Sequence, residues 1–233
     1  MSALLVAIEG IDGSGKGTQA SLLRDALANE GISCGLIAFP RYDATTFGRT
    51  IARYLNGEFG DLATAGPHFA ALLYAGDRFE SLPLIRSEME SRDVLIFDRY
   101  VPSNIAHQAA KLPPANRESF INWVESIEFG VYKLPRPDRV VFLDVPVETA
   151  QQLIARKPRR QYTAKSADLH EADAEYLKQT ADVYRHVAAH DSAWHIVHCC
   201  DERGLRSPEA MNREICDYVR SAAACGQRTG PTK

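Results

Sequence analysis

The chain has 233 residues, of which 24% are charged and 45% hydrophobic, and its formal net charge is −3. This length and composition are typical of one large soluble α/β domain with a complete core, and the small negative charge argues against a nucleic-acid or anionic-membrane binder. The apolar start ends at Glu9, so we expect neither a signal segment nor a membrane span. The five cysteines are odd in number and irregularly spaced, which favours a reduced, cytoplasmic protein.

Five short apolar runs predict the strands of the fold. Each is rich in Val, Ile, Leu and Phe and has no polar face, as expected for parallel strands covered on both sides. The runs are residues 3–9, 34–39, 94–98, 139–144 and 194–199. Helical patterns alternate with them at residues 17–29, 46–56, 67–90, 114–128, 147–157 and about 167–189. The alternation predicts an α/β fold with a doubly wound five-stranded parallel sheet and helices on both faces.

The chain shows no internal repeat and no low-complexity linker. We therefore predict a single domain over residues 1–221. Residues 222–233 are small and polar and include Gly and Pro, which predicts a disordered tail.

The clearest functional signal is a glycine-rich loop directly after the first strand. Residues 10–18 read Gly-Ile-Asp-Gly-Ser-Gly-Lys-Gly-Thr and open a helix, which matches a phosphate-binding P-loop. The glycines let backbone N–H groups turn toward phosphate oxygens, and the helix N-terminus adds its positive end. We expect all of these residues to bind ATP: Gly10, Ile11, Asp12, Gly13, Ser14, Gly15, Lys16, Gly17 and Thr18. Lys16 is expected to reach the β- and γ-phosphates and to be catalytic.

One position departs from the usual P-loop. Gly17 follows the lysine, where a Ser or Thr hydroxyl normally touches Mg²⁺. Thr18 comes one residue later, about 100° further round a helix, so the sequence leaves open how the ion is held. Asp98 closes a buried strand and is the candidate metal ligand, acting directly or through waters. Arg99 beside it could hold a second phosphate, and the alternative for both is a salt-bridged strand end.

Six segments together resemble the thymidylate kinase family. They are residues 9–16, Phe39-Pro40-Arg41-Tyr42, residues 72–78, Asp98-Arg99-Tyr100 with Ser103-Asn104, residues 134–138, and a basic stretch at 156–165. Their order and spacing span about residues 4 to 189, nearly the whole folded chain. The resemblance implies a P-loop NTPase fold and transfer of the γ-phosphoryl group of ATP, with Mg²⁺, to thymidine 5′-monophosphate (dTMP). It also implies a homodimer.

The resemblance also assigns roles in the acceptor site. Arg41 and Arg99 would hold the acceptor phosphate. Asp12 would accept from the sugar 3′-OH and face the arginine that holds the acceptor phosphate. Asp12 and Arg99 are both expected to be catalytic. Arg78 would donate to O4 of the pyrimidine, and Tyr74 would stack on the base. The predicted substrate site is completed by Phe39, Pro40, Ser103, Asn104 and His107.

Three of these residues have other interpretations. Tyr74 has the helical spacing of a core aromatic, and Arg78 could pair with Asp77 or Glu80 on a solvated face. His107 stands where members of the family usually carry an aromatic residue against the deoxyribose. Packing at that position would exclude a 2′-OH, so discrimination against ribonucleotides stays open, as does tolerance of dUMP.

A basic stretch at about residues 156–170 is predicted to form a short lid over ATP. The phosphate loop carries Gly13 where part of the family has a basic residue, so the resemblance implies that the lid supplies the phosphate-stabilising arginine. Arg156 and Arg160 are the catalytic candidates there, with Arg159 and Lys165 left open. From composition alone the stretch could equally be a solvated surface loop.

Two other kinds of function also fit the sequence. The first is a kinase for another nucleoside monophosphate or for a deoxynucleoside, since Gly17-Thr18-Gln19 is similar to adenylate kinases. The second is a nucleotide-binding module without transfer activity. A catalytically silent protein would be expected to lose Lys16, Asp98 or Arg99, and all three are present.

Overall fold

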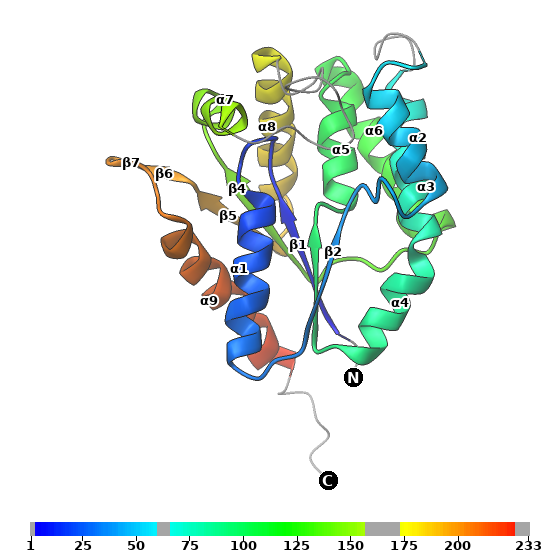
Figure 1. Cartoon of the computed structure of the whole chain (residues 1–233). Coiled ribbons are helices and arrows are strands. Elements are labelled where there is room, and N and C mark those ends of the chain that lie inside the picture. Colours follow the sequence, from blue (N-terminus) through cyan, green and yellow to red (C-terminus); the bar gives the residue numbers. More distant parts are fainter. Residues whose placement is uncertain (1–2, 60–65, 157–172, 227–233) are drawn as a thin grey trace.

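The computed structural model describes residues 3–59, 66–156 and 173–226, and its centre is a parallel sheet of five strands (Figure 1). The strands lie in the order β2-β3-β1-β4-β5. Their bounds are β1 Leu4–Glu9, β2 Cys34–Ala38, β3 Val94–Asp98, β4 Arg139–Asp144 and β5 Trp194–His198. The predicted doubly wound sheet is therefore confirmed, with strand ends within one residue of the apolar runs.

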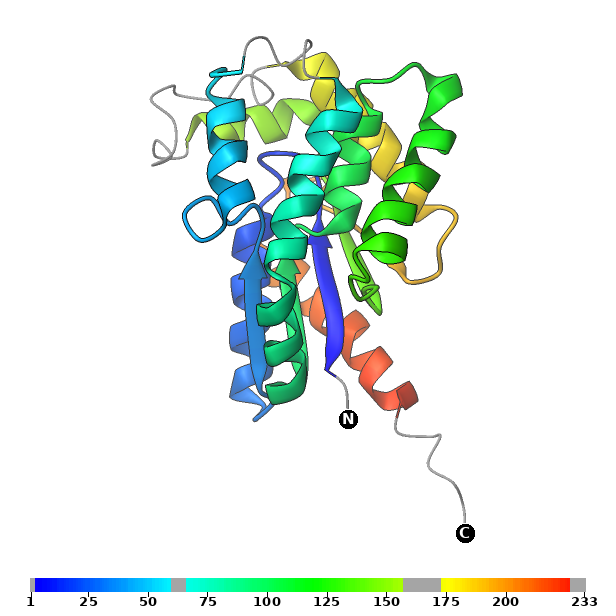
Figure 2. The same cartoon turned by 90° about the vertical axis from the view of Figure 1, so that its right-hand side faces the viewer.

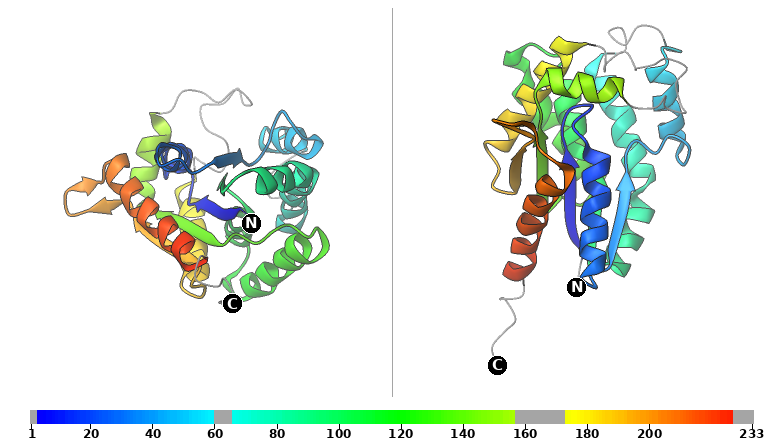
Figure 3. Two further views of the ribbon diagram at one scale, coloured as in Figure 1. Left: turned by 90° about the horizontal axis from the view of Figure 1, so that it is seen from below. Right: turned by 60° about the vertical axis from the view of Figure 1, so that its left-hand side comes forward.

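Helices cover both faces of this sheet. On one face α1 (Lys16–Asn29) packs on β1, β2 and β3, while α9 (Pro208–Gly226) packs on β4, β5 and α1, as the right-hand view of Figure 3 shows. On the other face α4 (Leu82–Ser91) contacts β3, and α8 (Ala174–Ala188) contacts β4 and β5. This double cover explains why Val6, Ile96 and Val141 in the central strands have no exposed surface.

The remaining helices gather around the carboxyl ends of the strands. Figure 2 shows α2 (Thr46–Leu55) beside α3 (Pro67–Glu80), and α7 (Val147–Ala155) lying across the strand ends. A smaller two-stranded hairpin, β6 (Cys200–Asp201) with β7 (Gly204–Leu205), follows β5. The other two helices here are α5 (Val101–Ala109) and α6 (Pro114–Glu125), and α6 continues into a π-helical segment, η1 (Ser126–Val131).

Some predicted helices were wrong in extent. The pattern at 67–90 is two helices, α3 and α4, because Pro83 lacks the N–H that a continuous helix would need. The helices α5 and α9 were not predicted. The last helix reaches Gly226, so it includes the start of the segment 222–233 that was predicted to be a tail. The first part of the predicted helix at 167–189 lies outside the described residues.

The strand order positions the functional site. Strands β1 and β3 are neighbours, with Ile8 opposite Asp98, so the phosphate loop after β1 and the Asp98-Arg99 pair at the end of β3 meet at one edge of the sheet. No helix in the described ranges is long and apolar enough to cross a membrane.

Candidate active site

The phosphate loop needs glycine because its backbone passes close to other backbone. Gly10 and Gly13 have φ of 149° and 84°, values that side chains rarely adopt. A Cβ on Gly10 would lie 2.8 Å from the carbonyl oxygen of Leu143, and one on Gly13 would lie 2.4 Å from that of Ala150 in α7. Gly15, with φ of 87°, has nothing within 4 Å of its Cβ direction. The sequence pattern of this loop therefore matches its steric demands.

Lys16 folds back over the loop that it belongs to. Its Nζ donates to the carbonyl oxygens of Gly10 and Ile11 at 2.8 and 2.7 Å and to Ser14 Oγ at 3.3 Å. Only 6% of the residue is exposed. Burial and the nearby positive charge of Arg99 lower the pKa of Lys16 to about 7, although acidic neighbours oppose this shift. Near neutral pH the Lys16 amine is therefore divided between its charged and its neutral form.

Asp98 lies directly against the residue that follows this lysine. A Cβ added to Gly17 would be 3.0 Å from Asp98 Oδ2. A carboxylate oxygen therefore occupies the region where the hydroxyl of a Ser or Thr would start. Thr18 is exposed. The hard oxygen donor that Mg²⁺ prefers is present at this point of the loop.

Arg99 follows β3 in a left-handed conformation with φ of 69°. The end of β1 holds the peptide groups on both sides of it: the Arg99 N–H donates to the carbonyl oxygen of Ile8 at 3.1 Å, and the Tyr100 N–H donates to Glu9 Oε1 at 2.7 Å. The guanidinium forms an ion pair with Asp12 of the phosphate loop. Burial alone would lower the pKa of Arg99, but the Asp12 carboxylate raises it above its usual value.

Glu9 is a fully buried carboxyl group at the end of β1. Besides the Tyr100 N–H, it accepts from Ser103 Oγ at 2.5 Å and from Tyr184 Oη at 3.0 Å, both to Oε2. Burial raises the pKa of Glu9, and the bonds from Ser103 and Tyr100 oppose that shift. The hydroxyl of Ser103, a predicted substrate ligand, is therefore engaged inside the protein.

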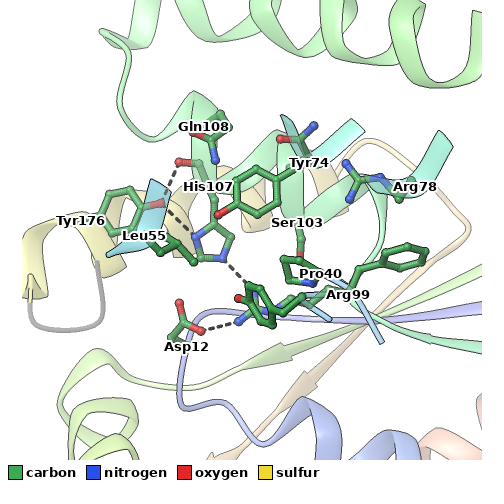
Figure 4. A pocket seen from close by; sticks show the side chains of 13 residues that line it. Asp12, Pro40, Leu55, Tyr74, Arg78, Arg99, Ser103, His107, Gln108 and Tyr176 are labelled. Atoms are coloured by element: carbon green, nitrogen blue, oxygen red, sulfur yellow. Dashed lines mark hydrogen bonds and ion pairs between the residues drawn. The ribbon is translucent and has the colours of Figure 1, made fainter. Parts of the chain in front are cut away.

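Beside the phosphate loop lies a cavity that encloses about 620 Å³, open solvent at its mouth included (Figure 4). It is lined by Asp12, Phe39, Pro40, Tyr42, Leu55, Tyr74, Arg78, Arg99, Ser103, Asn104, His107, Gln108 and Tyr176. Every predicted substrate residue except Arg41 is in this lining. Arg41 Nη1 instead donates to Ser81 Oγ at 3.1 Å. Because Tyr74 lines the cavity, it is available for the stacking role as well as for packing.

A buried ion pair supports one wall of the cavity. Arg78 Nε and Nη2 donate to the two oxygens of Glu128 at 2.5 and 2.6 Å, and these residues are 2% and 0% exposed. Arg78 therefore pairs with Glu128 in η1, and not with Asp77 or Glu80. Burial would lower the pKa of Arg78, but the charge of Glu128 raises it.

Asn104 is fixed by the same carboxylate. Its Nδ2 donates to Glu128 Oε1 at 2.8 Å and to the carbonyl oxygen of Ala71 at 3.0 Å. Both partners are acceptors, so the NH₂ group must face them, and the orientation of the amide is determined. Its Oδ1 is buried and has no hydrogen-bond partner among the described residues. Such an acceptor is costly unless a ligand satisfies it.

Sequence reasoning missed several residues at the site. Glu128 falls at the end of a helical pattern, and only the π-helical segment, a form frequent at functional sites, marks it in the structure. Tyr176 lies in the first turn of α8 and belongs to no motif, and Tyr42 belongs to the segment Phe39-Pro40-Arg41-Tyr42 but was given no role of its own. Leu55 and Gln108 also line the cavity without a sequence signal. Of the lid candidates, Arg156 is exposed just after α7, and Arg159, Arg160 and Lys165 lie outside the described residues.

Comparisons with known proteins identify the family of the chain. Residues 8–203 match the family model described as thymidylate kinase. The chain is 38% identical over 186 residues to the thymidylate kinase of Mycobacterium tuberculosis, which covers 80% of this chain and 86% of that protein. It is 32% identical to the human thymidylate kinase over 63% of each chain. A solved thymidylate kinase from Candida albicans has the same fold, with a TM-score of 0.73, 23% identity and coverage of 95% of this chain and 93% of that one. The chain belongs to the thymidylate kinase family.

Proposed function

We propose that the protein transfers the γ-phosphoryl group of ATP to dTMP and releases dTDP and ADP. The observation that supports this best is the combination of Asn104 and Arg78 in the same cavity as Arg99. The first two offer an acceptor and a donor suited to one edge of a pyrimidine, and Arg99 offers a cation suited to a phosphate. Family membership supports the same reaction.

The base would be read through hydrogen bonds of opposite direction. Thymine and uracil present an N3–H donor beside the O4 acceptor. The unpartnered Oδ1 of Asn104 suits N3–H, and a guanidinium N–H of Arg78 suits O4. Cytosine has an N3 acceptor and an N4 donor, so it would leave the Asn104 oxygen unsatisfied at a cost of about 1–3 kcal/mol. In this proposal Tyr74 stacks on the ring, and Phe39 and Pro40 form the apolar side.

The acceptor phosphate would be bound by Arg99, with Arg41 as a second ligand. The bond from Arg41 to the neutral Ser81 hydroxyl is weaker than one to a phosphate dianion, so a bound phosphate can compete for this side chain. Asp12 would accept from the 3′-OH while it orients Arg99. The surface of Ser103 would contact the sugar, and His107 lines the cavity with it.

The transfer itself needs no general base. A phosphate monoester has a second pKa of about 6, so the acceptor oxygen is already ionised at neutral pH. That oxygen forms a bond to the γ-phosphorus while the bond from phosphorus to the bridging oxygen breaks, and ADP keeps the electron pair. Lys16 would offset charge on the departing phosphate, and Arg156 or Arg160 would add charge from the lid. Alignment and charge neutralisation would supply the catalysis.

The loop residues Gly10 to Thr18 would cradle the ATP phosphates, with Asp98 nearest to a divalent ion. Because Asp98 Oδ2 lies against Gly17, the oxygen chemistry fits Mg²⁺ without a P-loop hydroxyl. The ion, when bound, would neutralise phosphate charge. Asp98 would hold it directly or through waters.

A homodimer is also proposed. Helix α3 exposes Phe69, Leu72 and Phe79, which are 52%, 38% and 49% exposed and fall on one side of the helix. Such a stripe suits packing against a second copy, and light scattering on the purified protein would measure the mass. We propose a cytoplasmic location, which suits a reaction on free nucleotides. The proposal gives no role to nucleic acid or to a membrane.

The test is ADP release with ATP and Mg²⁺ against dTMP, dUMP, dCMP, AMP, dGMP, UMP and thymidine. We expect turnover with dTMP, less with dUMP, and at least about tenfold less with dCMP, because one buried acceptor is then unmet. Lys16→Met should abolish turnover, and the exposed Lys178→Met is the matched control. Preference for AMP or for thymidine itself would contradict the acceptor-site assignments. Silence on every acceptor would favour a binding module without transfer activity.

A further inference from the structure

Four side chains form a continuous line of bonds along one wall of the cavity (Figure 4). Asp12 of the phosphate loop pairs with Arg99 Nη2, and Arg99 Nη1 lies 3.1 Å from His107 Nε2 in α5. His107 Nδ1 lies 3.1 Å from the hydroxyl of Tyr176, which donates in turn to the His107 carbonyl oxygen at 2.9 Å. The line joins the phosphate loop, the end of β3, α5 and the first turn of α8.

The partners determine where each proton in this line lies. An arginine can only donate, so His107 Nε2 must accept, and the imidazole is neutral with its proton on Nδ1. The Nδ1–H then donates to the Tyr176 oxygen, and the Tyr176 proton goes to the backbone carbonyl of His107. Each bond thus has one donor and one acceptor. The imidazole and the hydroxyl fit together in a single arrangement.

The two terminal nitrogens of Arg99 are held by different partners. Asp12 binds Nη2 and His107 binds Nη1, so the plane of the guanidinium cannot rotate without breaking a bond. The other N–H groups remain for a phosphate. Asp12 offers the guanidinium a negative charge, whereas the neutral His107 fixes the orientation of the guanidinium plane. The bond between Arg99 and His107 differs from the sugar contact expected for His107 from the sequence.

The far end of the line is itself fixed. Tyr176 lies in the first turn of α8, where the Asp173 side chain caps the helix by accepting from the N–H groups of Glu175 and Tyr176. A change in that turn would therefore move the Tyr176 hydroxyl, and with it the imidazole.

We propose that His107 is a positioning residue, which holds Arg99 in the orientation that binds the acceptor phosphate and ties that orientation, through Tyr176, to the start of α8. The inference rests on the proposed role of Arg99 toward the phosphate of dTMP. His107 acts through Arg99, so its removal should weaken binding of the phosphate and spare binding of the base.

The test compares the affinities of dTMP and thymidine, which differ only in the phosphate. Calorimetry would be run on the full-length wild type and on His107→Leu, His107→Gln and Tyr176→Phe, with the exposed His186→Leu on α8 as the matched control. His107→Leu should weaken dTMP about tenfold, as expected for one lost bond to a charged group, and thymidine less than about twofold. His107→Gln can accept from Arg99 and donate to Tyr176, so it should recover most of the loss. Tyr176→Phe should weaken dTMP only.

Two results would overturn the proposal. One is wild-type affinity for dTMP in His107→Leu; the other is an equal loss for dTMP and thymidine, which indicates a general structural role. If His107→Leu does not fold, the same comparison in Tyr176→Phe decides. A steady-state assay of the wild type separates the two proposals, because a wild type inactive on dTMP refutes the proposed function, whereas the dTMP–thymidine difference tests His107.

Discussion

Binding of ATP should change the protonation state of Lys16. In the free protein, burial and Arg99 lower the pKa of Lys16 to about 7. The loop accommodates the neutral amine, because Ser14 Oγ, at 3.3 Å from Nζ, can donate to it as well as accept. Bound phosphates bring negative charge close to Nζ and favour the ammonium form. Above pH 7 the complex should therefore take a proton from solution as it forms.

The size of this uptake follows from the pKa. A group with a pKa of about 7 is about 10% protonated at pH 8, so binding should take up about 0.9 proton there. The uptake should fall to about 0.5 proton at pH 7 and about 0.1 at pH 6.

Isothermal titration calorimetry of ATP and Mg²⁺ at pH 8 would measure the uptake. The apparent enthalpy is compared between Tris and HEPES buffers, whose ionisation enthalpies differ, and the difference gives the number of protons bound. Without dTMP no transfer occurs, and at this pH the terminal phosphate of ATP is already ionised. The variant Lys16→Met should show no uptake, and the exposed Lys178→Met should behave as wild type.

Equal enthalpies in both buffers for the wild type at pH 8 would refute the reasoning, because Lys16 would then already be charged in the free protein. Uptake that persists in Lys16→Met would assign the proton to another group.

Three further predictions concern stability. The pKa of Lys16 is about 7 in the folded protein and near 10.5 in the unfolded chain, so the unfolded chain binds more protons between these two pH values. Lys16 should therefore make the free protein more stable as pH rises from 7 toward 10, and urea unfolding at several pH values would measure this contribution. A flat or falling contribution relative to Lys16→Met would contradict the prediction. Glu128→Ala leaves the buried Arg78 unpaired and should cost about 3–5 kcal/mol in urea unfolding, whereas Glu125→Ala, which removes an exposed pair with Arg136, should cost less than about 1 kcal/mol. Gly15→Ala adds only left-handed backbone strain of about 1–2 kcal/mol. Gly13→Ala also brings a Cβ against the carbonyl oxygen of Ala150, so it should lower the melting temperature and the ATP affinity more than Gly15→Ala does. Equal effects of the two variants would show that the contact with α7 is easily relieved.

The parts of the fold that could be predicted depend on local signals. Apolar runs gave the strands because strands buried on both faces need no polar positions, and the phosphate loop was readable because its glycines meet a local steric demand. The break between α3 and α4 also has a local cause, since Pro83 cannot continue a helix, but the pattern at 67–90 was interpreted as one helix. The Arg78–Glu128 pair joins residues 50 positions apart, and no local pattern indicates such a contact.

The left-handed backbone of Arg99 shows why the two halves of the site act as one unit. A φ of 69° is unfavourable for an arginine, so the surrounding structure must hold it. The bonds that do so come from Ile8 and Glu9, the last residues of the strand that leads into the phosphate loop. The loop then returns Asp12 to the guanidinium of the same arginine. The strand that leads into the phosphate loop therefore also holds the proposed ligand of the acceptor phosphate, so a change at the end of β1 should affect both.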